Sequence, residues 1–137
     1  MRQTIVDAGP LVALLDARET HHEWASNVMG SLTSPLLTCE AVVSEACFIV
    51  RKIGRRHTAV LDLLSRGVLT IGFELEPEIA AVQRLMAYYA DLPMSLADAC
   101  LVRMTELAPD SVVLTLDSHF RIYRRHGRQP VPTIMPE

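Results

Sequence analysis

The chain has 137 residues, half of them apolar, and a formal net charge of −3. This length corresponds to one domain that can bury roughly two-thirds of its unfolded surface in one core. No apolar run approaches the ~18 residues of a membrane span, and the N-terminus lacks the basic start and apolar centre of a signal peptide, so we expect a cytoplasmic protein without a membrane segment. The acidic balance argues against a protein that coats nucleic acid generally.

The predicted elements alternate between short strands and helices. The strands are expected at residues 5–6, 36–38, 68–71 and 111–116, with a proline-bounded edge strand at 131–134. The helices are expected from Pro10 onward and at 21–31, 40–53, 57–65, 77–89 and 95–107, with a loop at 33–35 and a short helical segment at 120–125. This alternation predicts an α/β fold, in which a central parallel sheet of four to five short strands carries helices on both faces. We expect one domain over residues 1–137.

Neither the cysteines nor the histidines of the chain suggest a zinc site. The three cysteines form no CxxC pair, and the five histidines have no zinc spacing with them. We therefore interpret the cysteines as small buried hydrophobic residues in a reducing compartment.

Asp7 stands where the first strand ends, before Gly9 and Pro10 start a helix. In an open α/β sheet, ligands bind outside the carboxyl ends of the strands. Asp7 is therefore placed for chemistry, although capping of the next helix is the simpler interpretation.

Three further acidic residues have comparable positions. Glu45 lies beside the apolar stripe of its helix, where we expect a half-buried carboxylate that needs an ion pair or a cation. Asp98 is the third helical residue of a capping-box pattern that begins at Ser95. Asp117 follows the strongest predicted strand, where it either caps the next short helix or shares the sheet edge with Asp7. Carboxylates that converge there repel one another, and such a cluster suits a hard divalent cation such as Mg²⁺ or Mn²⁺.

Four short motifs around these residues, taken together, resemble those of PIN-domain ribonucleases. They are Ile5-Val6-Asp7, Val42-Val43-Ser44-Glu45, Leu96-Ala97-Asp98-Ala99 and Thr115-Leu116-Asp117-Ser118-His119-Phe120. Within that superfamily the chain most resembles the VapC-type toxins of bacterial toxin–antitoxin pairs, over residues 4–134. The resemblance implies a PIN-like three-layer fold and a Mg²⁺- or Mn²⁺-dependent endoribonuclease, with Asp7, Glu45, Asp98 and Asp117 as metal ligands and Thr115 as a hydroxyl near the metal.

The sequence departs from the family pattern at one position. Many relatives carry another acidic residue three positions before the third motif's Asp, where this chain has Ser95; Asp91 is the nearest substitute.

Two other classes of protein with acidic residues at the strand ends fit this sequence less well. A phospho-accepting receiver needs a late strand-end Lys, but the single Lys is Lys52 in a helix, and a phosphatase needs a second Asp where Gly9 stands. The remaining alternatives are an RNA-processing PIN nuclease without an antitoxin and a catalytically silent PIN-like interaction module.

Twelve of the thirteen basic residues are Arg, and they suggest how RNA would be held. One group comprises Arg51, Lys52, Arg55 and Arg56; a second group comprises Arg121, Arg124, Arg125 and Arg128. Solvated faces are an equally good interpretation of both. We predict that Arg121, Arg124 and Arg125 contact RNA, because they closely follow Asp117. The apolar composition predicts a homodimer, and the resemblance points the same way. The resemblance also implies a cognate antitoxin, which we expect to insert a basic side chain into the acidic pocket.

Overall fold

A five-stranded parallel sheet forms the centre of the protein. The computed structural model describes residues 2–32 and 35–137, so most of the loop predicted at 33–35 lies outside the described residues. The sheet order is β3-β2-β1-β4-β7. Its strands are β1 (Gln3–Val6), β2 (Leu36–Thr38), β3 (Leu69–Ile71), β4 (Ser111–Leu114) and β7 (Thr133–Ile134). β1 and β4 are central neighbours, paired from Gln3 with Ser111 to Val6 with Leu114.

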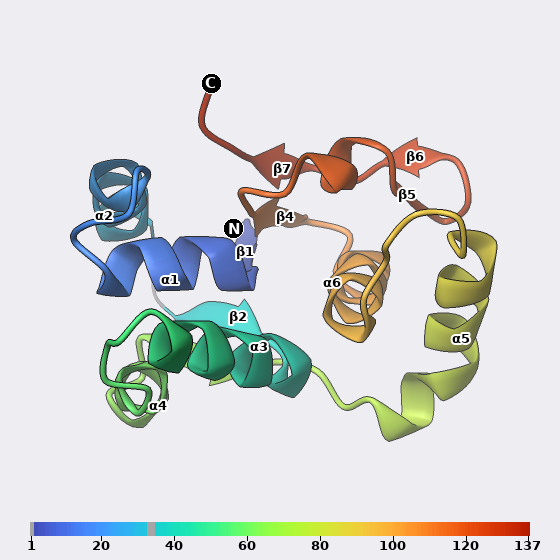
Figure 1. Cartoon of the computed structure of the whole chain (residues 1–137). Helices are drawn as coiled ribbons and strands as arrows, with labels where there is room; N and C mark the ends of the chain where they lie inside the picture. Colours follow the sequence, from blue (N-terminus) through green and yellow to red (C-terminus); the bar gives the residue numbers. More distant parts are fainter. Residues whose placement is uncertain (1, 33–34) are drawn as a thin grey trace.

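Helices cover both faces of the sheet. The helices are α1 (Ala8–Leu15), α2 (His22–Ser31), α3 (Glu40–Lys52), α4 (Ala59–Ser65), α5 (Ile79–Tyr88) and α6 (Leu96–Leu107), with a 3₁₀ turn η1 (Glu76–Glu78) before α5. In Figure 1 helices α1 to α4 lie on one side of the sheet and α5 and α6 on the other. Right-handed crossovers produce this arrangement, because the chain moves outward from β1 to β3 and then returns past β1 to β4. The predicted fold class is confirmed.

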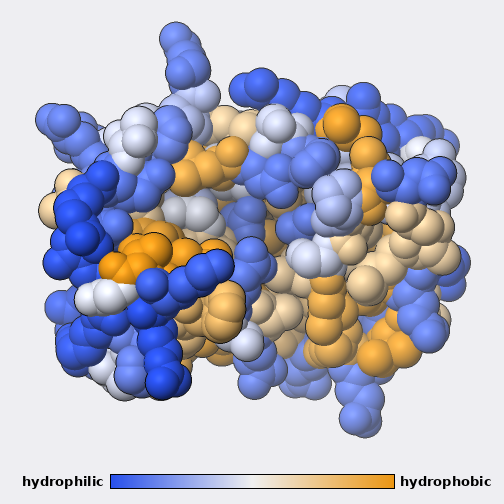
Figure 2. Space-filling model, in the orientation of Figure 1, coloured by the Kyte–Doolittle hydropathy of each residue, from blue (hydrophilic) through white to orange (hydrophobic). Residues whose placement is uncertain are grey.

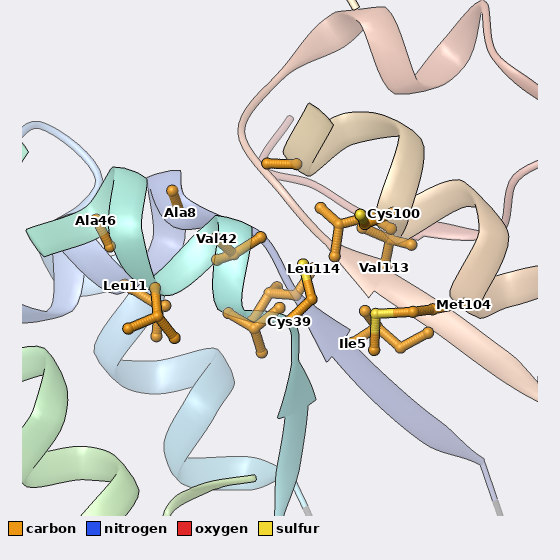
Figure 3. Close-up of a cluster of buried hydrophobic side chains, with 14 of the residues drawn as sticks. Ile5, Ala8, Leu11, Cys39, Val42, Ala46, Cys100, Met104, Val113 and Leu114 are labelled. Carbon is orange, nitrogen blue, oxygen red and sulfur yellow. The ribbon is translucent and has the colours of Figure 1, made fainter. Parts of the chain in front are cut away.

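The core lies where the two central strands meet helices of both layers. Ile5, Val113 and Leu114 are fully buried, as expected for strands covered on both faces. Figure 3 shows these strand residues between Val42 and Ala46 of α3 on one side and Cys100 and Met104 of α6 on the other. Packing on both faces therefore fixes the register of β1 against β4.

The segment after β4 differs from the prediction. Instead of a helical segment at 120–125, a 3₁₀ turn η2 (Ser118–Arg121) is followed by β5 (Arg124–Arg125), which pairs antiparallel with β6 (Gln129–Pro130). The turn begins early because the Asp117 side chain accepts from the His119 N–H. The hairpin forms because His126 and Gly127, at φ 54° and 76°, reverse the chain in the left-handed region.

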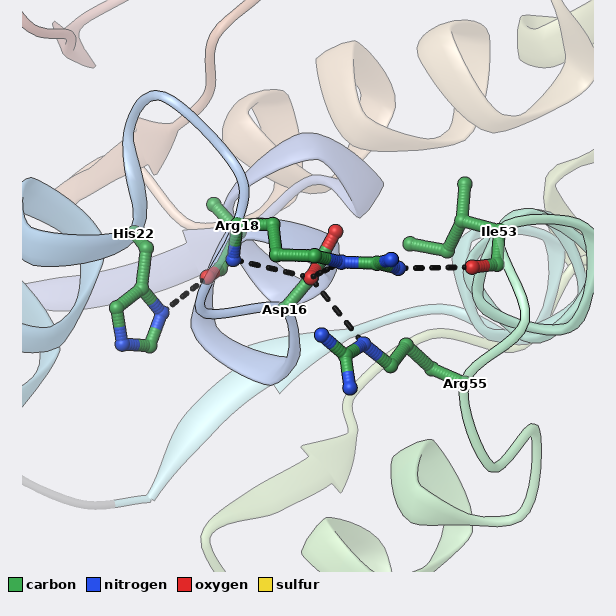
Figure 4. Close-up of polar contacts among 6 residues, drawn as sticks. Asp16, Arg18, His22, Ile53 and Arg55 are labelled. Atoms are coloured by element: carbon green, nitrogen blue, oxygen red, sulfur yellow. Dashed lines mark hydrogen bonds and ion pairs between the residues drawn. The ribbon is translucent and has the colours of Figure 1, made fainter.

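A polar network fastens the C-terminal end of α1 to its neighbours (Figure 4). Asp16 accepts from the backbone N–H and the Nε of Arg18 and from the Nε of Arg55. Arg18 also donates to the carbonyl of Ile53 at the end of α3. Hydrogen bonding from the Arg18 N–H, with the two guanidinium groups, holds the pKa of Asp16 below its usual value. Arg55 of the first basic group is therefore a structural residue.

The described helices are too short or too polar to cross a membrane. The longest, α3, has 13 residues.

Candidate active site

The four acidic residues singled out in the sequence come from four different segments around one edge of the sheet. Asp7 directly follows β1, and Asp117 follows the neighbouring strand β4 by three residues. Asp98 lies in the first turn of α6, and Glu45 lies on α3. Charge repulsion between Asp7 and both Asp98 and Glu45 contributes to the pKa of Asp7, which places these carboxylates within electrostatic range of one another. We call Asp7, Glu45, Asp98 and Asp117 the acidic cluster.

Asp7 is the most buried member of the cluster, with 6% of its surface exposed. Its Oδ1 accepts from the Ala8 N–H at 2.7 Å, so it is the N-cap of α1, as the simpler interpretation predicted. Its Oδ2 accepts from the Thr115 hydroxyl at 2.7 Å. Burial raises the pKa of Asp7 to about 6, although both hydrogen bonds act in the opposite direction. Asp7 therefore caps α1 and is at the same time a member of the acidic cluster.

Thr115 joins the ends of the two central strands. It is fully buried, and while its hydroxyl donates to Asp7 it also accepts from the Asp117 N–H at 3.0 Å. The single Thr115 hydrogen is used by Asp7. Thr115 therefore holds two acidic residues in place.

Asp98 is held by two structural elements. Ser95 and Asp98 form the predicted capping box, in which the Ser95 hydroxyl accepts from the Asp98 N–H at 3.0 Å. Ser95 is therefore occupied with capping, while Asp91 is exposed. The second element is Tyr123, whose buried hydroxyl donates to Asp98 Oδ2 at 2.9 Å. Burial raises the pKa of Asp98, and the charge of Asp117 adds to the increase.

Asp117 caps η2 and is paired with a histidine. Its Oδ1 accepts from the His119 N–H, and the His119 Nδ1 lies 2.9 Å from the same oxygen. The His119 ring also stacks on Tyr123, with ring centroids 6.4 Å apart. Because Tyr123 bonds Asp98, His119 and Tyr123 link the surroundings of Asp117 to those of Asp98.

Glu45 is exposed to solvent, so the prediction of a half-buried carboxylate is wrong. The buried face of α3 is formed by Val42, Val43, Ala46 and Val50. Glu45 lies on the flank of that face, next to exposed Ser44 and Phe48. Partial desolvation still raises its pKa, helped by the charges of Asp98 and Asp117. Within residues 2–32 and 35–137, no basic side chain forms a salt bridge with Glu45.

The donor set of the acidic cluster suits a hard cation. All four side chains offer carboxylate oxygens, and the repulsion among them is relieved by positive charge. In their present positions, no three His, Cys, Asp or Glu side chains of the described residues are arranged so that they could hold a metal ion. A cation would therefore have to draw the carboxylates closer together, and exposed Glu45 has the most freedom to move.

The three arginines predicted to contact RNA have different environments. Arg121 is exposed. Arg124 donates to the carbonyls of Arg121 and Tyr123. Arg125 donates to the carbonyls of Thr105 and Pro109, and so closes the C-terminal end of α6.

Sequence reasoning missed two residues that shape the site. Tyr123 carries no local pattern that points to Asp98, since the two are 25 residues apart. Gly9 is the second residue, because a glycine inside a helix is unusual enough to suggest close packing. A Cβ at Gly9 would lie 3.2 Å from the Leu116 Cβ. The missing side chain lets α1 approach the segment that carries Asp117.

Comparison with known proteins identifies the family and the fold of the chain. A model of the PIN domain family matches residues 4–125. Ribonuclease VapC26 of Mycobacterium tuberculosis is 30% identical over 126 residues, which cover 90% of this chain and 93% of that protein. The crystal structure of M. tuberculosis VapC20, described as a Sarcin-Ricin loop cleaving toxin, matches with a TM-score of 0.81 at 15% identity, covering 93% of this chain and 100% of that chain. The structural match confirms the predicted PIN-like fold. With its four motifs at one sheet edge and a family match over most of its length, the chain belongs to the PIN domain family.

Proposed function

We propose that this protein is a Mg²⁺- or Mn²⁺-dependent endoribonuclease, and that it is the toxin of a toxin–antitoxin pair. The observation that carries the proposal is the acidic cluster, where burial and mutual repulsion raise the pKa of three carboxylates. A ribonuclease relative of nearly equal length supports the activity. We treat residues 1–137 as one nuclease domain, because the sheet takes strands from both ends of the chain.

Asp7, Glu45, Asp98 and Asp117 are the proposed metal ligands. A bound divalent cation lowers the pKa of water and offsets charge on a phosphate. Asp7 is held by the Thr115 hydroxyl and Asp98 by the Tyr123 hydroxyl, so these two carboxylates form the rigid part of the site. Glu45 is exposed and adjusts its position.

The central test is the Asp98→Asn variant, with Asp91→Asn as its matched control. Asn keeps the shape and can still cap α6, but it removes one negative charge from the acidic cluster. We expect cleavage of RNA in Mg²⁺ or Mn²⁺ to collapse in Asp98→Asn and to persist in Asp91→Asn. EDTA should abolish cleavage by the wild type and by Asp91→Asn. Mapping RNA ends then identifies the bond. Full activity of Asp98→Asn would remove Asp98 from the site and contradict the proposal.

Thermal melts separate a metal ligand from a capping residue. Because the pKa of Asp98 is raised, we expect metal-free Asp98→Asn to be at least as stable as the wild type. Added Mn²⁺ should then raise its melting temperature less than that of the wild type. An equal increase in both proteins would show that Asp98 does not bind the ion.

Two alternatives remain open to experiment. An RNA-processing PIN nuclease would cleave RNA without arresting growth and without a neighbouring antitoxin gene. A silent interaction module would show no cleavage with either cation. Expression of the chain with and without the candidate antitoxin, followed by a growth measurement, distinguishes the toxin from the processing enzyme.

Of the three predicted RNA-binding arginines, Arg121 is the most available, because its side chain is exposed and makes no salt bridge with another described residue. We expect Arg121→Ala to weaken RNA binding and to lower the salt slope by about one, while Arg66→Ala, just after α4, leaves both unchanged. We expect Arg124→Ala to act like Arg121→Ala. Arg125→Ala should chiefly lower stability, since it removes two carbonyl contacts at the end of α6. Unaltered affinity in Arg121→Ala would return this group to the solvated-face interpretation.

We propose a homodimer because large apolar side chains remain exposed. Phe48 is 67% exposed and Leu61 49%. Figure 2 shows separate hydrophobic patches on one face, divided by hydrophilic residues. A mass of two chains in light scattering at micromolar concentration is the expected result, and a monomer would contradict it.

The proposed antitoxin blocks the acidic cluster with a basic side chain, most suitably Arg, whose positive charge takes the place of the metal ion's. A structure of the inhibited complex tests this directly. The idea fails if the carboxylates remain open to solvent and metal in that complex.

A further inference from the structure

A groove of about 820 Å³ lies outside the acidic cluster, between α5, α6 and the β5–β6 hairpin. These elements occupy one end of the molecule, with the hairpin above α5 and α6 in Figure 1. The groove is lined by Arg84, Tyr88 and Tyr89 from the α5 segment, by Arg103 and Glu106 from α6, and by Arg124 from β5, with the turn at 126–127 at its rim. None of the acidic cluster lines it.

The lining of this groove is positive although the whole chain is negative. It contains three arginines and one glutamate, whereas the chain carries a net charge of −3. Glu106 is neutralised by Arg103, which also pairs with Glu78. In the part of the chain that the structure describes, no carboxylate pairs with Arg84 or Arg124. The groove therefore attracts an anion.

The hairpin that forms one wall is held in place before any ligand arrives. The His126 N–H donates to Glu106 Oε2 at 2.7 Å while His126 adopts a φ of 54°. The Arg124 N–H donates to the Tyr89 hydroxyl at 2.8 Å. These bonds fix the hairpin to α6 and to the end of α5, so the groove is preorganised.

Aromatic surface accompanies the positive charge. Tyr88 is 77% exposed and meets Tyr89 edge to face, with ring centroids 4.9 Å apart. One face of the Tyr88 ring is thus available for stacking. Arginines beside exposed aromatic rings are the combination with which proteins bind single-stranded nucleic acid, where phosphates contact the cations and bases stack on the rings.

The groove is connected to the acidic cluster through two tyrosine rings. Tyr89 packs against Tyr123 with centroids 5.1 Å apart, and the Tyr123 hydroxyl bonds Asp98. Both rings are buried, so they form the layer of side chains between the groove and the acidic cluster, and a strand that lies over this layer would reach from one to the other. An acidic peptide would match the charge equally well, but it would leave the exposed ring without a stacking partner.

We propose that this groove binds a single-stranded segment of the RNA substrate that flanks the cleaved bond, with its phosphates near Arg84 and Arg124 and a base on Tyr88. The inference rests on the proposed function, because the strand in the groove is the one presented to the acidic cluster. Substrate choice then depends on unpaired nucleotides beside the cleavage site.

The test measures RNA binding without cleavage. The probe is a fluorescein-labelled oligouridylate of about 12 nucleotides, with anisotropy read in EDTA, where the acidic cluster repels RNA. Tyr88→Ala should weaken binding roughly 5- to 100-fold, since one stacked base is lost, and Tyr88→Phe should retain it. Arg84→Ala should weaken binding and lower the salt slope by about one. Arg66→Ala is the matched exposed arginine control, and should bind as the wild type does.

Each outcome bears on the proposal. Equal losses in Arg84→Ala and Arg66→Ala would overturn it, because binding would then not be specific to the groove. If the groove variants keep their RNA affinity but lose affinity for labelled oligoglutamate, the groove is a protein-docking site and the proposal is wrong. A parallel Mn²⁺ cleavage assay separates this test from that of the proposed function: a wild type that cleaves no RNA refutes the nuclease, whereas unaltered binding in the groove variants refutes only the groove.

Discussion

Replacement of Thr115 by Val tests whether one hydroxyl organises the acidic cluster. The two side chains have nearly the same shape, and Thr115 is fully buried, so the change removes hydrogen bonds without opening a cavity. The hydroxyl donates to Asp7 Oδ2 at 2.7 Å and accepts from the Asp117 N–H at 3.0 Å. Both partners lose a bond in the variant.

The expected magnitude follows from these two bonds. A hydrogen bond to a charged group contributes about 1.5–3 kcal/mol, and a buried N–H left without a partner adds about 1 kcal/mol, so Thr115→Val should cost roughly 2–4 kcal/mol. Thr105→Val is the matched control, because Thr105 is equally buried but its hydroxyl only donates to the Val102 carbonyl at 2.6 Å. That carbonyl belongs to α6, and we expect the control to lose about 1 kcal/mol or less.

The same change should shift the titration of Asp7. The Thr115 hydrogen bond lowers the pKa of Asp7, so its loss should move that pKa above its present value of about 6. Urea unfolding at pH 7.5 measures the stability, and carbon-detected NMR follows the Asp7 carboxyl group through its titration. Equal destabilisation of the two variants, together with an unshifted Asp7 titration, would refute the role given to Thr115.

Three further predictions follow from single contacts. Burial raises the pKa of Asp7 from 3.8 to about 6, so its contribution to the stability of the metal-free protein is fully present below pH 4 and is lost as the pH rises through 6, a change of roughly 3 kcal/mol. Urea midpoints between pH 4 and 7 should therefore vary less in Asp7→Asn than in the wild type. The same dependence of the midpoint on pH in both proteins would show that Asp7 is not its cause. Tyr123→Phe removes the hydroxyl that donates to Asp98, so calorimetric titration with Mn²⁺ should show weaker binding and melts a loss of about 1–2 kcal/mol, whereas unchanged values would mean that the bond is dispensable. Gly9→Ala places a Cβ 3.2 Å from the side chain of Leu116 and should destabilise the protein. Gly30→Ala in α2 meets no atom within 4 Å and should stabilise the protein by about 0.5–1 kcal/mol. Thermal melts compare the two variants, and a stabilised Gly9→Ala would show that α1 and Leu116 are not tightly packed.

The sequence by itself determined the features that depend on neighbours along the chain. The alternation of strands and helices and the capping box at Ser95 and Asp98 appear where local pattern predicts them. Asp7 and Asp117 were predicted to share an edge because parallel strands end on the same side of a sheet. For Asp7, Asp98 and Asp117 the sequence also predicted helix capping, and all three carboxylates accept bonds from nearby backbone N–H groups.

Tertiary structure alone decided which side chains hold those carboxylates and how exposed each one is. Thr115 meets Asp7 across 108 residues of chain. Tyr123, which directly precedes β5, meets Asp98 because β5 packs against α6. Glu45 is exposed although its position beside the apolar stripe of α3 suggested a half-buried side chain. The periodicity of a helix shows which face is apolar, but not how far neighbouring helices cover the margin of that face. The β5–β6 hairpin replaced a predicted helical segment because Glu106, on a distant helix, holds the left-handed turn at His126. Such contacts depend on the register and packing of elements far apart in sequence, which no local pattern records.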